Sequence, residues 1–251
     1  MKQEGKSTEH FLAAESSRRE YSLEAIREYE KFFLKLVDML KREIDDGVYS
    51  LLVSDDIGGR IPSLALHRVM ELRRGRAPKL VFIPGFSFSK QPKKPYKKPS
   101  PEFLEEARDY LDKLDASRRR TLLVSEYAGS AETVKGLLRF LEENKVIADL
   151  AVPVSRLSWA KLFKAVNEHS QDHRHNVVVA FDGNEDIPQL DLMSAELAGV
   201  LRKVTGEGLT GLEKKTSLSG KERAVIQQQI NKTREDAFLL AERAVEKVWG
   251  S

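Results

Sequence analysis

The chain has 251 residues, of which 41% are hydrophobic and 32% charged, enough for one buried α/β domain with helical additions. It contains no cysteine, which excludes disulfides and thiolate metal sites, and no apolar run of about 18 residues that would predict a transmembrane helix. The net charge of +3 arises from 42 basic and 39 acidic residues, a balance too mild to indicate nucleic-acid binding by itself.

The N-terminal part predicts a polar arm followed by a long helix. Residues 1–21 have no clear period and lack the apolar core of a signal peptide, so we expect a flexible arm on a cytoplasmic protein. Ser22 is a candidate N-cap for a helix that Gly47 would end. One face of this helix is apolar at spacings of three and four residues: Ile26, Tyr29, Phe33, Leu36, Val37, Leu40 and Ile44. We interpret it as a packing helix.

A first glycine-bearing loop follows the β-type run Val48–Val53 and precedes a helix predicted over Leu64–Leu72. The loop contains Asp55, Asp56, Gly58, Gly59 and Arg60. The two glycines would allow either a close backbone approach or a positive φ, and a guanidinium suits phosphate oxygens. A glycine pair alone more often marks an ordinary turn, and the two aspartates are at least as well explained as a solvated turn.

A second strand is predicted over Lys79–Ile83 and is followed by a lysine-rich segment, residues 86–101. This segment carries four prolines and five lysines, among them Lys90 and Lys93, so it predicts a long exposed loop. Two interpretations are equally supported: a solvated surface loop, or a lid whose lysines close on an anionic ligand.

The central stretch of the chain is Arg120–Thr133, which follows a helix predicted over Glu102–Leu114. An apolar run, Thr121–Val124, stops at Glu126, and small or hydroxylated residues lead into a helix over Thr133–Glu142. Such a strand, loop and helix N-terminus presents free backbone N–H groups and the positive end of the helix dipole. The stretch therefore predicts a phosphate site.

Further apolar runs alternate with helical patterns: strands over Val146–Val154 and Asn176–Phe181, and a helix over Trp159–Asn167. This alternation predicts an α/β fold with a mainly parallel sheet, helices on both faces and a Rossmann-like core. Ligands bind such sheets at the carboxyl ends of the strands, where both glycine-bearing loops would lie.

The C-terminal part reads as a helical extension, residues 191–251, attached to a core at residues 22–190. A helix is expected over Leu190–Val204, a loop over Gly206–Gly211, and a second helix from Ser219 to Val248 with a capping box at Ser219 and Glu222. Its apolar stripe is Ile226, Ile230, Ala237, Leu240, Ala244 and Val248. The stripe could pack on the core, cover the site or mediate a homodimer, and packing is favoured.

Together the two loops resemble those of the type I phosphoribosyltransferases. In that family an apolar strand, two acids and a Thr/Gly-rich turn bind 5-phosphoribosyl 1-pyrophosphate (PRPP). Leu122–Val124 resemble the strand, and Ser125 and Glu126 fall where the acids belong. The residues that follow occupy the turn: Tyr127, Ala128, Gly129, Ser130, Ala131, Glu132 and Thr133.

The resemblance implies roles for several residues. Glu126 would bind the ribose hydroxyls, and the turn would hold the 5′-phosphate through its amides, Ser130 and Thr133. Gly58, Gly59 and Arg60 resemble the pyrophosphate loop, the lysine-rich segment occupies the place of the flexible catalytic loop, and Phe181 and Asp182 lie where many members contact the base. Mg²⁺ is the implied cofactor, with Asp55 or Asp56 as its ligands.

Two departures from the family pattern keep two hypotheses open. Ser125 replaces the first acid, and Ala131 replaces a glycine, which adds strain if its φ is positive. The first hypothesis is a phosphoribosyltransferase that acts on a small heterocyclic acceptor and releases pyrophosphate. The second is a non-catalytic module that binds PRPP or a nucleotide and regulates a partner. We place the enzyme ahead, and expect neither membrane nor nucleic-acid partners.

Overall fold

The computed structural model describes residues 19–55, 59–83, 100–129, 131–168, 174–183 and 220–250. Its strands are β1 (Leu51–Asp55), β2 (Lys79–Ile83), β3 (Thr121–Val124), β4 (Tyr127–Ala128), β5 (Ala148–Ser155) and β6 (Val177–Phe181). Its helices are α2 (Glu24–Met39), α3 (Lys41–Asp46), α4 (Arg60–Arg74), α5 (Pro101–Lys113), the short η1 (Ala116–Arg118), α6 (Glu132–Glu143), α7 (Trp159–Asn167) and α8 (Gly220–Trp249).

The strands form one sheet in which every described pairing is parallel. From one edge the order is β2, β1, β3 and β5, and β6 pairs with β5. Strand β4 continues β3 along the same neighbour, since Thr121 pairs with Ala148 and Tyr127 with Val154 in an unchanged register. The predicted α/β fold with a mainly parallel sheet is confirmed.

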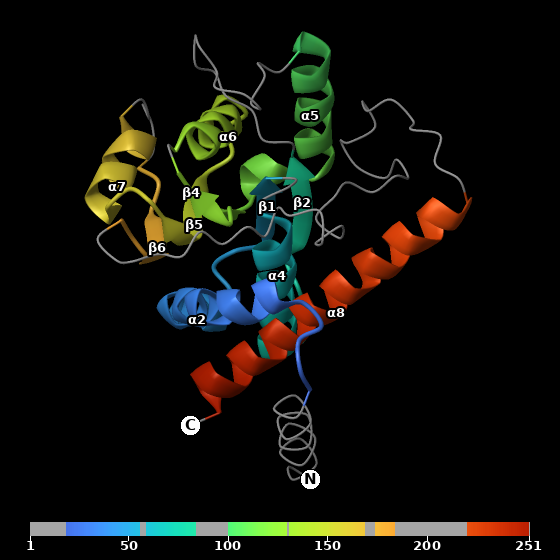
Figure 1. Ribbon diagram of the computed structural model, residues 1–251. Coiled ribbons are helices and arrows are strands. Elements are labelled where there is room, and N and C mark those ends of the chain that lie inside the picture. The colour runs from blue at the N-terminus through green and yellow to red at the C-terminus, as the bar shows by residue number, and fades with distance from the viewer. Residues whose placement is uncertain are drawn as a thin grey trace, which may run out of the picture.

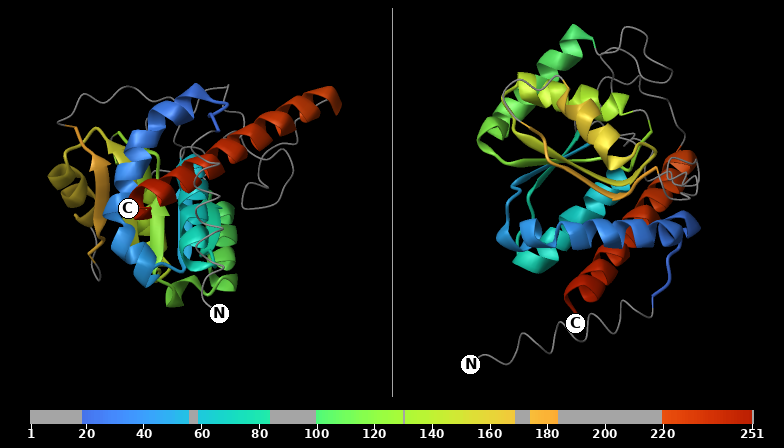
Figure 2. Two further views of the ribbon diagram at one scale, coloured as in Figure 1. Left: turned by 90° about the horizontal axis from the view of Figure 1, so that it is seen from below. Right: turned by 90° about the vertical axis from the view of Figure 1, so that its left-hand side faces the viewer.

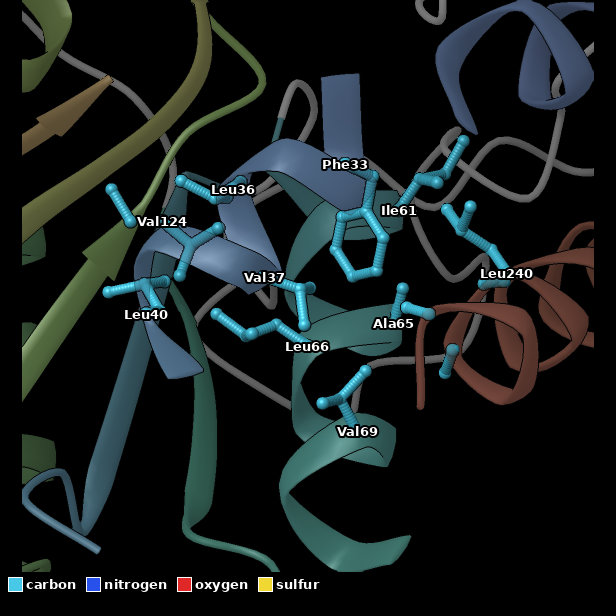
Figure 3. Packing of buried hydrophobic residues seen from close by; sticks show 14 of the residues in the cluster. Phe33, Leu36, Val37, Leu40, Ile61, Ala65, Leu66, Val69, Val124 and Leu240 are labelled. Atoms are coloured by element: carbon cyan, nitrogen blue, oxygen red, sulfur yellow. The ribbon is translucent and has the colours of Figure 1, made fainter. Parts of the chain in front are cut away.

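Helices cover both faces of this sheet, as predicted (Figures 1 and 2). One hydrophobic cluster lies beneath α5, α6 and α7, and a second lies beneath α2, α4 and α8. The strands supply alternate residues to the two clusters: Leu122 and Val124 point into the second, and Leu123 into the first. Figure 3 shows how Phe33 of α2, Leu66 of α4 and Leu240 of α8 gather in the second cluster.

The apolar face predicted for the first helix is buried along its whole length, from Ile26 to Ile44. The prediction of one continuous helix is wrong, because the chain breaks at Leu40, where φ is −93° and ψ is 3°. Gly47 ends α3 with a φ of 64°, as expected for a glycine that closes a helix.

The predicted N-cap at Ser22 is also wrong. The N-cap of α2 is Leu23, whose side chain accepts no hydrogen bond there. Instead, the carboxylate of Asp236 on α8 accepts the N–H groups of Ser22 and Leu23 at 3.0 and 2.8 Å. A residue more than 200 positions away therefore does what a local cap usually does.

Helix α8 packs on the core, the role favoured for it, because Ala237, Leu240 and Ala244 are buried in the cluster with α2 and α4. Among the described helices, none has the length and apolar character needed to cross a bilayer. The helix expected over Leu190–Val204, the loop over Gly206–Gly211 and the cap at Ser219 lie outside the described residues.

Candidate functional site

The candidate site lies where β1 and β3 end side by side. Ser54 pairs with Val124, so the loops that follow these two strands leave the sheet next to each other. The chain order reverses between β1 and β3, with β2 on one side and β5 on the other. In open parallel sheets, ligands bind outside the carboxyl ends of the strands at such a switch point. We call Asp55, Gly59, Ser125 and Glu126 the β1–β3 edge.

Gly59 brings the first loop onto the end of β3. Its N–H donates to the Asp55 carbonyl at 3.2 Å. A Cβ at this position would lie 2.2 Å from Ser54 Oγ, 2.3 Å from Asp55 Oδ1 and 2.6 Å from the Val124 carbonyl oxygen. The φ of Gly59 is −86°, so glycine is needed here for close approach and not for a positive φ. Gly58 and Asp56 lie outside the described residues.

Arg60 is the first residue of α4, so the helix N-terminus and a guanidinium lie at the same edge. The guanidinium carbon lies 5.2 Å from the centre of the Phe82 ring on β2, a cation–π contact. The Arg60 carbonyl accepts the Ser63 hydroxyl at 3.1 Å, which fixes the first turn of the helix.

Ser125 and Glu126 interrupt the ladder between β3 and β4, and both are buried. The Ser125 N–H still donates to the Ala151 carbonyl at 3.1 Å. Because Val124 pairs with Ala151 and Tyr127 with Val154, the interruption lies beside Pro153, which has no N–H to donate. The missing ladder donor gives a physical reason for the break.

The predicted phosphate turn differs from a direct strand-to-helix loop, because Tyr127 and Ala128 pair with β5 first. Ala131 is then the N-cap of α6 with a φ of 62°, and its methyl is buried in the cluster beneath α5 and α6. The first helical hydrogen bond joins the Lys135 N–H to the Ala131 carbonyl at 2.8 Å. The amides of Glu132 and Thr133 precede it, as a phosphate turn requires. Ser130 is not among the described residues.

Tyr29 of α2 lies in the buried cluster that also contains Val124 at the end of β3 and Ile61 of α4. The sequence marked it only as part of an apolar face. The residue is 0% exposed, and its hydroxyl has no hydrogen-bond partner among the described residues. Burial first, and then the carboxylates of Glu126 and Asp55, hold the pKa of this hydroxyl well above its usual range. Tyr29 is therefore a protonated donor close to both carboxylates.

Two residues predicted to contact the base have other contacts here. The Asp182 carboxylate accepts the Trp159 N–H at 2.8 Å, at the N-terminus of α7. The Phe181 ring lies edge-on to Phe32 with 4.8 Å between centroids, and Lys35 Nζ lies 4.1 Å above it. Helix α2 thus contacts the end of β6. Lys90 and Lys93 fall outside the described part of the chain.

Arg156 is a candidate that the sequence did not single out, because no motif surrounds it. Its N–H donates to the Ala128 carbonyl at 3.0 Å, and its guanidinium carbon lies 5.8 Å from the centre of the Tyr127 ring. Tyr127 is 39% exposed, so the pair forms a cationic and aromatic surface beside the predicted phosphate turn.

The donor chemistry of the edge suits Mg²⁺. No group of three His, Cys, Asp or Glu side chains that could hold a metal ion occurs in the described ranges. Mg²⁺ is usually held by one or two carboxylates together with water and substrate phosphates. Asp55, predicted as a metal ligand, ends β1 and offers a carboxylate of this kind.

No protein-family model matches the chain, and no curated protein matches it.

Proposed function

We propose that the chain is a PRPP-dependent phosphoribosyltransferase with a type I phosphoribosyltransferase-like core. The observation that carries the proposal is the contact of the two loops: Gly59 of one lies against the Val124 carbonyl at the start of the other. Nearly 70 residues separate these loops in sequence, and their juxtaposition at the reversal of strand order supports one shared ligand.

In the proposed reaction, the bond between C1 of the ribose and the pyrophosphate oxygen breaks, and its electron pair leaves with pyrophosphate. A nitrogen of the acceptor forms the new bond to C1 and gives up its proton. Arg60 and the N-terminus of α4 hold the pyrophosphate charge, while Glu126 holds the ribose hydroxyls beside the cationic sugar. Asp55 would hold Mg²⁺, which would supply positive charge against the leaving group.

Isothermal titration with PRPP and Mg²⁺ tests the binding step, and a pyrophosphate-release assay over a set of nucleobases tests the transfer. We expect Glu126→Ala and Arg60→Ala each to weaken PRPP binding about tenfold or more, because each removes a charge-assisted contact. Arg118→Ala is the matched control, since Arg118 lies in η1 before β3 and pairs with Asp115. Unchanged affinity in both test variants would place the site elsewhere.

One observation favours a second candidate, a PRPP-binding regulator without transferase activity. Glu126 is only 5% exposed, so the site presents little of the one carboxylate that would stabilise the cationic sugar during transfer. Ser125 moreover supplies no second carboxylate. PRPP binding without pyrophosphate release for any base would support the regulator, and no binding at millimolar PRPP would reject both candidates.

A further inference from the structure

The hydroxyl of Tyr29 is an unusual polar group near the candidate site. It is fully buried and has no hydrogen-bond partner within the described part of the chain, although buried hydroxyls are normally paired. Burying such a group without a partner destabilises the fold. Phenylalanine would fill the same space without that cost, so packing alone does not account for the hydroxyl.

The neighbours of Tyr29 indicate the role of its hydroxyl. Its ring packs with Phe32 and Phe33 on the same helix, each with 6.5 Å between centroids, which holds the side chain in place. The charged groups that act on the hydroxyl are the carboxylates of Glu126 and Asp55, one from each loop of the β1–β3 edge. Tyr29 packs in the same buried cluster as Val124, the last residue of β3, and Ile61 in the first turn of α4. A fixed and protonated donor thus lies near the strand ends that carry the two acidic residues.

We propose that Tyr29 is a positioning residue of this site, whose hydroxyl donates a hydrogen bond to the Glu126 carboxylate when PRPP engages that carboxylate. The inference rests on the proposed function and deepens it, because it names a residue that acts through Glu126. Removing the hydroxyl should then have opposite effects on the protein alone and on its complex. The protein alone loses a buried unpaired group, while the complex loses a hydrogen bond to a charged acceptor.

Tyr29→Phe directly tests these opposite effects on the protein alone and on its PRPP complex. We expect the variant to raise the Tm without ligand by about 2 to 4 °C. We expect it to weaken Mg²⁺-PRPP binding about tenfold in isothermal titration. A purely structural tyrosine would lower the Tm and leave the affinity unchanged. A fall in Tm, including failure to fold, or an unchanged affinity would overturn the proposal.

Tyr49→Phe is the matched control. The Tyr49 hydroxyl is paired, donating to the Asp149 carboxylate at 2.9 Å, and Tyr49 precedes β1 at the amino ends of the strands. Its removal should lower the Tm and leave PRPP affinity unchanged. The same reversal in Tyr49→Phe would show that any tyrosine-to-phenylalanine change produces it, and would overturn the assignment to Tyr29.

A double variant separates this inference from the proposed function. If Tyr29 acts through Glu126, Tyr29→Phe combined with Glu126→Gln should bind PRPP no more weakly than Glu126→Gln alone. Additive losses would overturn the positioning role while leaving the proposed function standing. Absence of PRPP binding by the parent protein would overturn both.

Discussion

At the residue scale, Gly59 is where the two loops of the candidate site meet, and it leaves no room for a side chain. We expect Gly59→Ala to lower the free energy of unfolding by about 1 to 3 kcal/mol, because the new methyl would overlap Ser54, Asp55 and the Val124 carbonyl. Urea denaturation measures the loss. The strain falls on the β1–β3 edge, so PRPP affinity should fall as well.

Gly129→Ala is the control for that substitution, because Gly129 lies in the other loop and the atoms nearest to a Cβ there all belong to the Tyr127 ring. The nearest atom to a Cβ there is Cε1 of Tyr127 at 3.1 Å, the end of a partly exposed side chain that can move. Its cost should be about 1 kcal/mol or less. Equal losses at the two glycines would contradict the close approach seen at Gly59.

Ala131 shows the opposite combination to Gly59. Its φ of 62° lies in the region that favours glycine, yet the residue is alanine. This backbone conformation is therefore strained at Ala131. The methyl is buried with Val134 and Leu137, so burial offsets part of the strain. It also points into the core, which leaves the amides at the start of α6 free of its bulk.

At the scale of elements, the start of α2 depends on a carboxylate from α8, and this contact should respond to pH. Burial raises the pKa of Asp236, against the lowering effect of the two backbone hydrogen bonds. A raised pKa means that the folded state favours the protonated acid. The contribution to stability is therefore complete below the unfolded pKa of about 3.9 and declines as pH rises through the folded pKa.

Asp236→Asn should remove this pH dependence, because the amide does not titrate. We expect the stability of the parent relative to Asp236→Asn to fall as the pH rises above about 4, measured as the difference in urea midpoint. Asp236→Ala should lose the same pH dependence, and should be about 1 kcal/mol less stable than Asp236→Asn at all pH values because it also loses the cap. A parent advantage that grows with pH would mean that the capped carboxylate has a lowered pKa.

The sequence predicted most elements, because apolar periodicity reports which side of an element faces the core. It predicted the buried face of α2 but not the break at Leu40, where neither glycine nor proline marks the change. It missed β4, since Tyr127 and Ala128 form a strand only through pairing with β5. The cap from Asp236 was beyond local prediction, because its partners lie far away in the chain.

For the candidate site, the sequence predicted which loops follow strands and would therefore lie at the carboxyl ends of the sheet. Asp55, Gly59 and Glu126 come together because β1 and β3 are neighbours, which the alternating pattern suggested without giving the strand order. Tyr29 was missed because a buried aromatic at helical spacing gives the same sequence pattern whether or not its hydroxyl serves the site. Its burial without a hydrogen-bond partner among the described residues, and the two carboxylate charges that act on it, distinguish the cases.

At the scale of the whole molecule, the two edges of the sheet have different chemistry. The carboxyl edge holds the acids and glycines of the candidate site. At the amino edge, the strands are linked through Asp149, which is fully buried at the start of β5. Its carboxylate accepts Tyr49 Oη at 2.9 Å, Arg120 at 3.0 Å and the Asn176 N–H at 3.1 Å. These partners precede β1, β3 and β6, so one side chain links four strands.

Asp149→Ala should therefore destabilise the whole sheet. We expect the free energy of unfolding to fall by about 2 to 4 kcal/mol, because a buried hydroxyl and a backbone N–H lose their acceptor. Arg120 is 44% exposed and can turn to water, which keeps the loss below that of a fully buried ion pair. Arg139→Met is the control: it removes an exposed pair with Glu143 and should cost about 0.5 kcal/mol or less.

Since folded domains are stable by about 5 to 15 kcal/mol, the loss at Asp149 should appear as one cooperative shift in both circular dichroism and tryptophan fluorescence. Separate transitions in the two signals would show that the strands are not held together by this carboxylate.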